Sequence, residues 1–357
     1  MIAGINGYIG TALRTHLLNA GHEVFGFDNG SRDLNAAAMK AGSIVKKEIF
    51  DFELLDAACV YEDLKKYIKK NNPDTIVWLA EQPSAPFSML SPRHCNNTLT
   101  NNIIGTMNVL NAIKEVNPEI HLIKLGTEGE YPDWIWNGKK IPEGHRMTVQ
   151  HNGENWEIPT PRYFGSWYHS TKFYESYLID YACKIWGLRA TDVNQGIVYG
   201  HRNGTRLDVD YYFGTVVHRF VAQAVAGVPM TVFGEGGQTR GMICIQDSIE
   251  AIRLLIENPT GRGDFRVIHQ TTKEYSVMQV AEMIKELIPS AEIKKIENPR
   301  AEMTQNKFTF DNTTLMTLRL EPTSLEEELP KLIELVKANK ENIKIENLMP
   351  EDAARWK

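Results

Sequence analysis

The 357-residue sequence predicts an α/β fold, in which a doubly wound parallel sheet carries helices on both faces. Expected strands and helices alternate along the first half of the chain, and such alternation is typical of a parallel sheet. The expected strands are residues 1–3, 23–27, 44–49, 75–79, 121–125 and 190–197, and the expected helices are 11–18, 61–70, 101–116 and 167–186.

The pattern changes near Gly200, where a loop rich in glycine, aspartate and arginine begins. Further helices are expected at 213–226 and at 325–340, the second of them amphipathic. We therefore expect a first domain at 1–196, to which about 238–262 returns, and a smaller C-terminal α/β domain at 197–357.

Three glycines, Gly4, Gly7 and Gly10, lie between the first strand and the first helix. Glycines there let the backbone approach a pyrophosphate, and the free N–H groups of the helix receive it. The second strand ends at Asp28, where a carboxylate can accept hydrogen bonds from ribose hydroxyls. This order predicts a Rossmann-type site for NAD rather than NADP. Arg32 is the open alternative, because a guanidinium just past that strand could bind a 2′-phosphate.

Tyr168 and Lys172 are four residues apart in an expected helix, which puts both side chains on one face. An ammonium group there can lower the pKa of the phenol and favour the phenolate. The phenolate can remove a proton from a sugar hydroxyl while hydride leaves the same carbon. The alternative is a surface pair that shares a helix by chance.

The composition indicates a protein that binds neither nucleic acid nor a membrane. Net charge is −6, and charges of both signs are interspersed along the chain. No apolar run has bilayer-spanning length, and we expect no signal peptide because the first strand begins at Met1. The cysteines have no metal-binding spacing, which predicts reduced thiols in the cytoplasm and no metal site; they are Cys59, Cys95, Cys183 and Cys244.

Six segments carry a resemblance that runs nearly end to end. They are EQPSAPFSM from Glu81, NNIIGT from Asn101, KLGTEGEY from Lys124, YHSTK from Tyr168, WGLRATDVNQGIVYG from Trp186 and GGQTRG from Gly236. With the glycine motif, they make the chain similar to the extended short-chain dehydrogenases/reductases. Within that superfamily it resembles the NAD-dependent epimerase/dehydratase family and, most closely, the UDP-sulfoquinovose synthases.

The resemblance implies a reaction on a UDP-hexose, bound mainly by the second domain. In such enzymes NAD takes hydride from C4, the C5 proton and the 6-hydroxyl are lost, sulfite adds to C6, and the hydride returns. Sulfite, or a protein that delivers it, is an implied partner. The nearest alternative is a dehydratase or epimerase that adds no sulfite. A catalytically silent NAD-sensing protein is a more distant one.

The resemblance also assigns residues. Tyr168 would be the base at O4, Lys172 would hold the nicotinamide ribose, and Thr127 would bind the same sugar oxygen as Tyr168. The candidate catalytic residues are Thr127, Glu128, Glu130, Tyr168, His169 and Lys172. The candidate cofactor ligands are Gly4, Gly7, Tyr8, Ile9, Gly10, Asp28, Asn29, Asp51, Phe52, Leu79, Ala80, Glu81, Asn102, Tyr168, Lys172 and Gln195. The candidate substrate ligands are Ser84, Gln195, Arg206, Thr215, Arg240 and Arg300.

Two positions depart from the family pattern. Glu128 stands where the UDP-sulfoquinovose synthases typically have methionine, and Pro83 stands where arginine is expected. Glu128 directly after Thr127 resembles the nucleotide-sugar dehydratases. Two nearby carboxylates can have their pKa values pushed apart, so that one donates a proton and the other accepts it.

Relatives of this type imply a homodimer built from helices 101–116 and 167–186. Apolar Ile103, Met107, Leu110 and Ile113 recur at helical spacing on the first of these. Burial in the core of one chain would explain the same spacing.

Overall fold

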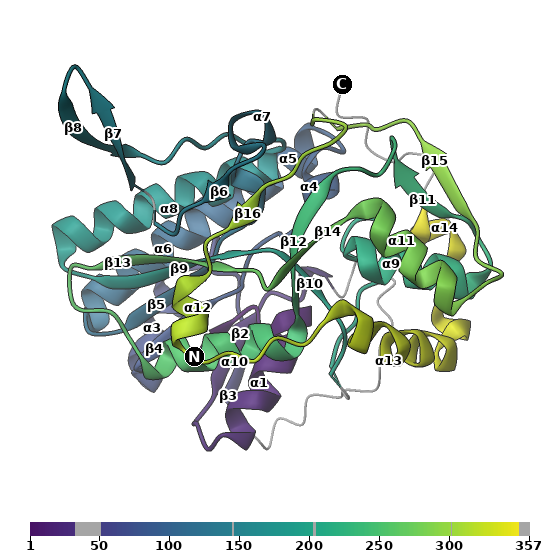
Figure 1. Ribbon diagram of the computed structural model, residues 1–357. Helices are drawn as coiled ribbons and strands as arrows, with labels where there is room; N and C mark the ends of the chain where they lie inside the picture. Colours follow the sequence, from purple (N-terminus) through teal and green to yellow (C-terminus); the bar gives the residue numbers. More distant parts are fainter. Residues whose placement is uncertain (33–50, 145, 203–204, 301, 350–357) are drawn as a thin grey trace.

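The computed structural model describes residues 1–32, 51–144, 146–202, 205–300 and 302–349 (Figure 1). The strand expected at 44–49 lies outside these residues. Within the described ranges no helix is both long and apolar enough to cross a bilayer.

A seven-stranded sheet forms the centre of the first half of the chain, and every neighbouring pair of its strands is parallel. Its order is β13-β9-β5-β4-β1-β2-β3. From β1 the chain adds β2 and β3 on one side and β4 and its successors on the other, so the order of strands reverses between β1 and β4. Ligands of such sheets bind at that reversal, outside the carboxyl ends of the strands. The strands are β1 (Ile2–Ala3), β2 (Phe25–Asp28), β3 (Asp51–Leu54), β4 (Thr75–Trp78), β5 (His121–Leu125), β9 (Arg189–Gln195) and β13 (Phe265–Gln270).

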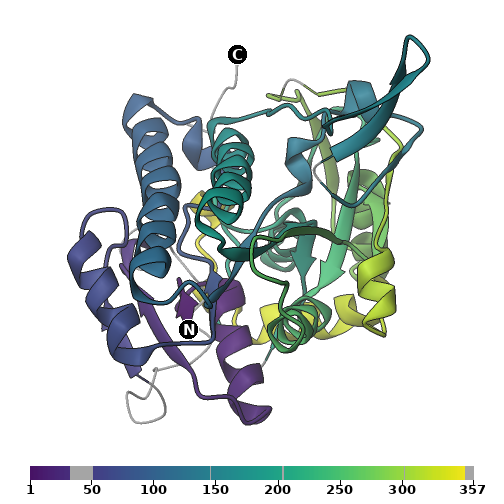
Figure 2. The same cartoon turned by 90° about the vertical axis from the view of Figure 1, so that its left-hand side faces the viewer.

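Side chains of each strand alternate between two cores, one on each face of the sheet. In β4, Val77 packs in one core while Ile76 and Trp78 pack in the other, as the two-residue period of a strand requires. Helices α1 (Tyr8–Asn19) and α10 (Ile245–Glu257) cover the first face. Helices α3 (Tyr61–Asn71), α6 (Gly105–Val116) and α8 (Trp167–Trp186) lie beside one another on the second face (Figure 2). The predicted doubly wound Rossmann-type sheet is therefore confirmed.

The second half of the chain builds smaller sheets around α9 (Val216–Ala226). One contains β10 (Ile197–Tyr199), β12 (Thr239–Cys244) and β14 (Lys273–Ser276), and another contains β11 (Met230–Phe233) and β15 (Ile293–Ile296). Helices α11 (Val277–Leu287), α13 (Leu325–Ala338) and α14 (Ile345–Leu348) also lie in this half. Because α10 and β13 pack with the first half, the chain crosses between the two parts more than once. The division into two domains stays a prediction.

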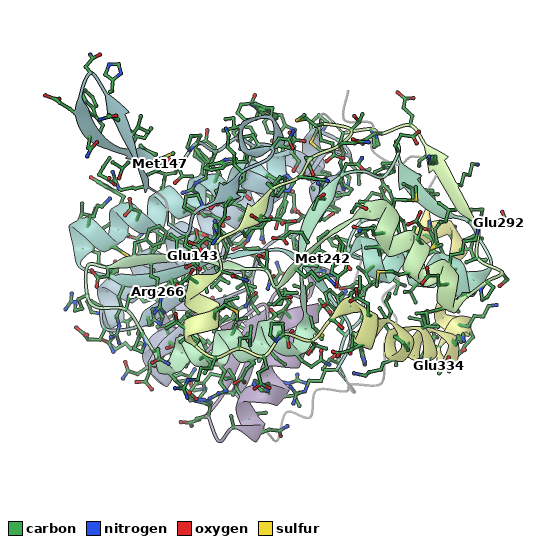
Figure 3. The ribbon with its side chains drawn as sticks, in the orientation of Figure 1. Glu143, Met147, Met242, Arg266, Glu292 and Glu334 are labelled. Carbon is green, nitrogen blue, oxygen red and sulfur yellow. The ribbon has the colours of Figure 1, made fainter. Side chains whose placement is uncertain are left out.

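Short elements connect these parts. They are α4 (Ala85–Ser88), α5 (Pro92–Leu99), the π-helical turn η1 (Thr100–Ile104), the 3₁₀ turn η2 (Glu128–Glu130), α7 (Asp133–Trp136), β6 (Lys140–Ile141), β16 (Thr309–Phe310), α12 (Thr313–Thr317) and the 3₁₀ turn η3 (Lys340–Asn342). A hairpin of β7 (Arg146–His151) and β8 (Glu154–Pro159) projects from the body, and Figure 3 labels Met147 near its base.

Candidate active site

Two adjoining cavities lie at the carboxyl edge of the parallel sheet. Their volumes are about 860 Å³ and about 350 Å³, and Thr127, Tyr168 and Gln195 line both. The larger cavity is also lined by the candidates Gly4, Gly7, Tyr8, Ile9, Gly10, Asp28, Asn29, Leu79, Ala80, Glu81, Lys172, Arg206 and Thr215. The smaller is also lined by Ser84, Glu128, His169, Thr215, Arg240 and Arg300. The side chains of Asp51 and Phe52 lie outside the described part of the structure.

The glycine loop shapes one wall of the larger cavity. Gly4 has φ +75°, and a Cβ there would come within 2.4 Å of the Leu79 carbonyl oxygen, so the turn requires glycine. Gly7 is the N-cap of α1. The first helical residues, Tyr8 to Gly10, line the cavity, and N–H groups at this end of a helix have no intrahelical acceptor. The loop therefore fits a pyrophosphate.

Asp28 lies beside this loop at the end of β2. Its carboxylate accepts hydrogen bonds from the backbone N–H of Asn6 at 3.1 Å and of Gly30 at 2.9 Å. These bonds fix the carboxylate at the cavity wall, and a carboxylate has further lone pairs for two ribose hydroxyls. The residues present thus fit NAD.

Tyr168 and Lys172 lie in the first turns of α8, whose N-cap Ser166 accepts a hydrogen bond from the His169 N–H at 3.2 Å. Lys172 Nζ donates to the Leu125 carbonyl oxygen at 2.7 Å and forms an ion pair with Glu81. Burial lowers the pKa of the Lys172 ammonium.

The pKa of Tyr168 is raised well above its usual value, chiefly by burial and then by the negative charge of Glu175. A hydrogen bond with Thr127 acts in the opposite direction. The expectation that Lys172 lowers this pKa is wrong for this state of the protein. Burial of the phenol outweighs the effect of the Lys172 ammonium, although Nζ lies only 5.8 Å from the centre of the Tyr168 ring.

Glu128 lies one residue beyond Thr127 and lines the smaller cavity. Its Oε2 accepts a hydrogen bond from the Gly241 N–H at 2.8 Å. Burial raises the pKa of this carboxyl to about 8, although Arg240 and the Gly241 hydrogen bond act against the rise. At neutral pH Glu128 therefore holds a proton and can act as a general acid.

This raised pKa predicts a pH-dependent effect of Glu128→Gln on stability. Below the usual carboxyl pKa the folded and unfolded chains both hold the Glu128 proton, so the difference in stability between mutant and wild type should not change with pH there. As pH rises to about 8 the unfolded chain gives up the proton more readily, and wild type progressively loses stability that glutamine retains. Thermal unfolding between pH 5 and pH 9 should show a growing advantage for the mutant. A difference that did not change with pH would contradict the assignment, and the exposed Glu334→Gln is the control.

His169 is the other titratable candidate in the smaller cavity. Its ring packs so closely on Gly129 that a Cβ there would lie 2.3 Å from Nε2. Burial, followed by the charges of Arg300 and Arg240, lowers the pKa of His169 to about 3. The imidazole is therefore neutral, and its Nδ1 makes a hydrogen bond with Ser166 Oγ at 2.9 Å.

Glu130 does not fit the catalytic role predicted for it. It is fully buried, lines neither cavity, and has Asn194 Nδ2 at 2.8 Å and Arg162 at 3.2 Å. Its backbone carbonyl also accepts a hydrogen bond from the Tyr163 N–H. Glu130 thus braces the loops behind the cavity, and the prediction erred because sequence does not say which carboxylate of the turn points inward.

Asn102 is a similar correction among the cofactor ligands. It is fully buried, and its Oδ1 accepts a hydrogen bond from the Gln82 N–H at 2.8 Å. Its Nδ2 donates to Thr171 Oγ1 at 2.8 Å and to the Gln82 carbonyl oxygen at 3.2 Å. Its neighbour Asn101 lines the larger cavity instead. Both lie in the π-helical turn, whose altered period changes which residue faces the cavity.

Arg219 is a pocket residue that the sequence did not reveal. It lies on α9, lines the smaller cavity and is in contact with the Tyr211 and Phe233 rings, and burial lowers its pKa to about 10. Arg240 and Arg300 line the same cavity, and Arg240 pairs with Glu302. Three guanidinium groups in one small cavity suit an anionic ligand such as a diphosphate. The available signal was an arginine within the otherwise largely apolar stretch 216–226.

Comparison with known proteins agrees with this geometry. Residues 1–268 match the NAD dependent epimerase/dehydratase family. The chloroplastic UDP-sulfoquinovose synthase of Spinacia oleracea is 36% identical over 385 residues, which span 100% of this chain and 79% of the relative. The UDP-sulfoquinovose synthase of Sulfolobus acidocaldarius is 37% identical over 349 residues, spanning 90% and 88%.

Solved structures support the fold. UDP-glucuronic acid 4-epimerase from Bacillus cereus, in complex with UDP-glucuronic acid and NAD, has a TM-score of 0.73 at 24% identity and covers 94% of this chain and 98% of its own. UDP-glucose 4-epimerase from Thermotoga maritima, with UDP-glucose, has a TM-score of 0.72 at 21% identity and the same coverage.

Proposed function

Since the chain belongs to the NAD-dependent epimerase/dehydratase family, we propose that it converts UDP-glucose and sulfite to UDP-sulfoquinovose. The observation that carries this proposal is the wall shared by the two cavities. Tyr168 and Thr127 stand between a cavity that fits NAD and a smaller one with a protonated carboxyl and three guanidinium groups. The two synthases named above support the choice of sugar and nucleophile.

Bound NAD would supply the hydride acceptor for C4 and would return the hydride at the end. The glycine loop, Asp28 and Lys172 would hold it. In its phenolate form Tyr168 takes the proton of the hexose 4-hydroxyl, and Thr127 positions the side chain through their hydrogen bond. The guanidinium groups of Arg219, Arg240 and Arg300 bind the diphosphate and so place the hexose against this pair.

Elimination needs one proton donor and one acceptor. The C6–O bond breaks and its oxygen takes the Glu128 proton, while the C5 proton passes to His169, which lines the same cavity. Among these three residues His169 is left as the acceptor, because Glu128 already holds a proton and Glu130 lines neither cavity. Sulfur of sulfite then bonds to C6, and His169 returns the proton to C5.

Glu128 also supports a second candidate function, a dehydratase that adds no sulfite. After donating its proton the carboxyl is anionic, and at about 4 Å and an effective dielectric near 20 it repels a like unit charge by roughly 4 kcal/mol. Arg240 offsets part of this repulsion. Sulfite addition therefore depends on Glu128 regaining its proton before the nucleophile arrives.

A panel of nucleotide sugars tests the proposed substrate. We expect sulfite-dependent consumption of UDP-glucose, and no decarboxylation of UDP-glucuronic acid. Turnover of UDP-glucuronic acid in preference to UDP-glucose would contradict the proposed substrate, because relatives in the same family include UDP-glucuronic acid decarboxylases.

We also propose that the protein is a homodimer, though not through the apolar stripe expected on helix 101–116. Leu110 and Ile113 of that stripe are buried in the core of their own chain, which leaves Ile103 and Met107 partly exposed. Leu110 and Ile113 are thus buried within one chain, which is the alternative that the helical spacing left open.

Helix α8 offers a better contact surface. Tyr174, Tyr177, Tyr181 and Ile185 are 49%, 37%, 62% and 48% exposed and recur at helical spacing on one face. Tyr181→Glu should convert a dimer to monomers, because it places a charge in the middle of an apolar contact. Light scattering at micromolar concentration checks this, with Met316→Glu, at an exposed apolar residue on α12, as the control. A wild-type monomer, or dimeric Tyr181→Glu, would contradict the interface.

The free cysteines support a cytoplasmic location, which we propose as well. Cys59 is exposed and Cys95 partly exposed, and neither forms a disulfide. Exposed thiols of this kind are typical of reducing compartments.

A further inference from the structure

A segment from the second half of the chain, residues 205–213, forms part of the wall of the larger cavity beside the glycine loop. It is held there by bonds to the first half of the chain. The Arg206 N–H donates to Thr11 Oγ1 at 3.1 Å, and the Ser84 hydroxyl donates to the Tyr212 carbonyl oxygen. Arg206, Asp208, Tyr212 and Phe213 line the cavity from this segment.

The same segment binds Arg32, the residue that could indicate NADP. The Arg32 guanidinium forms an ion pair with Asp208, whose side chain is 3% exposed, and lies 4.8 Å from the centre of the Phe213 ring. It remains beside the glycine loop, since a Cβ on Gly7 would lie 3.8 Å from Arg32 Nη1. Arg32 therefore lines the cofactor cavity with its charge already matched by a carboxylate.

We propose that Asp208 is a specificity-determining residue, which excludes NADP by holding Arg32 against segment 205–213. Just past β2 a guanidinium is suited to bind a 2′-phosphate through two parallel hydrogen bonds. Paired with Asp208 through Nη2, the guanidinium already has its charge balanced, and a 2′-phosphate would face two carboxylates, Asp28 and Asp208. NAD carries ribose hydroxyls at this position, and they can donate hydrogen bonds to Asp28 without disturbing the Arg32–Asp208 pair.

Two other charged residues, Arg206 and Asp210, lie near the Arg32–Asp208 pair, and their roles differ from that of Asp208. Arg206 Nε also donates to Asp208, at 2.9 Å, so loss of the carboxylate changes the surroundings of two guanidinium groups. Asp210 is close enough to interact electrostatically with Arg32, but its Oδ1 accepts hydrogen bonds from the N–H groups of Tyr212 and Phe213. Asp210 therefore shapes the turn, and Asp208 is the carboxylate that contacts Arg32 directly.

The test measures binding of NAD and of NADP by calorimetry, after bound cofactor has been removed from the full-length protein. Asp208→Asn and Asp208→Ser should each improve NADP affinity relative to NAD by about tenfold or more, because Arg32 becomes available to the phosphate. Asp208→Glu keeps the carboxylate and should show the same ratio of NADP to NAD affinity as wild type. Asp311→Asn, which breaks an exposed ion pair with Lys140 elsewhere, should leave the ratio unchanged.

The double variant Asp208→Asn/Arg32→Ala identifies the responsible cation. Its ratio should return to that of wild type. An unchanged ratio in folded Asp208→Asn or Asp208→Ser would overturn the proposal, and so would a gain that persists in the double variant, since Arg206 would then be the ligand. Circular dichroism establishes that each variant is folded. The readout is cofactor binding, so it stands apart from whether sulfite is added to the sugar.

Discussion

Tyr168→Phe should slow hydride transfer from the sugar by roughly two to four orders of magnitude, the usual contribution of a general base. The substitution removes one hydroxyl from the wall between the two cavities, and with it the group that takes the proton of the 4-hydroxyl. The ring remains, so folding and NAD binding should be retained. Rapid mixing with UDP-glucose, followed by the absorbance of NADH, measures the effect.

Tyr174→Phe is the matched control, because Tyr174 lies on the same helix but outside both cavities, and the substitution keeps its ring on the proposed contact face. It should behave as wild type. A Tyr168→Phe protein that reduced its NAD at the normal rate would remove the phenol from the mechanism and leave Thr127 to be tested in its place.

Glu128→Gln should slow loss of the 6-hydroxyl by a similar factor of roughly a hundred to ten thousand. Glutamine has nearly the same shape but cannot donate the proton that the departing oxygen needs. In wild type the step requires the protonated carboxyl, so its rate should fall as pH rises above about 8, and the mutant should lack this dependence. Mass spectrometry of samples taken over time measures how fast wild type and mutant lose the oxygen at C6.

Exchange of the C5 proton with deuterated solvent separates the two proton transfers. Glu128→Gln should still exchange that proton, because His169 is the proposed acceptor. Glu334→Gln, on the exposed face of α13, should match wild type in both measurements. Equal elimination by Glu128→Gln and wild type would show that Glu128 is a bystander.

The parts of the fold and site that sequence could predict are those set by local order along the chain. The glycine loop, the acidic end of β2 and the strand end before Thr127 are each read from a few consecutive residues. Their convergence follows because parallel strands present their carboxyl ends at one edge. The helical spacing of Tyr168 and Lys172 belongs to the same class of signal.

What sequence could not supply depends on orientation and on distant contacts. Glu128 and Glu130 are two residues apart in one turn, and only the fold shows that the first faces the cavity and the second lies behind it. The pairing of Arg32 with Asp208 joins positions 176 residues apart, beyond any local pattern. The expected pKa of Tyr168 fails for a related reason, since the burial that raises it is set by the packed fold and not by the spacing to Lys172.

Mass spectrometry of the products formed from UDP-glucose, with and without sulfite, tests the central claim most directly. The proposed function predicts a product heavier than the substrate by one SO₂, formed only when sulfite is present and absent from the Tyr168→Phe reaction. A product lighter by one water whether or not sulfite is added would show a dehydratase, and a product of unchanged mass with inverted C4 would show an epimerase. Either result would contradict UDP-sulfoquinovose formation.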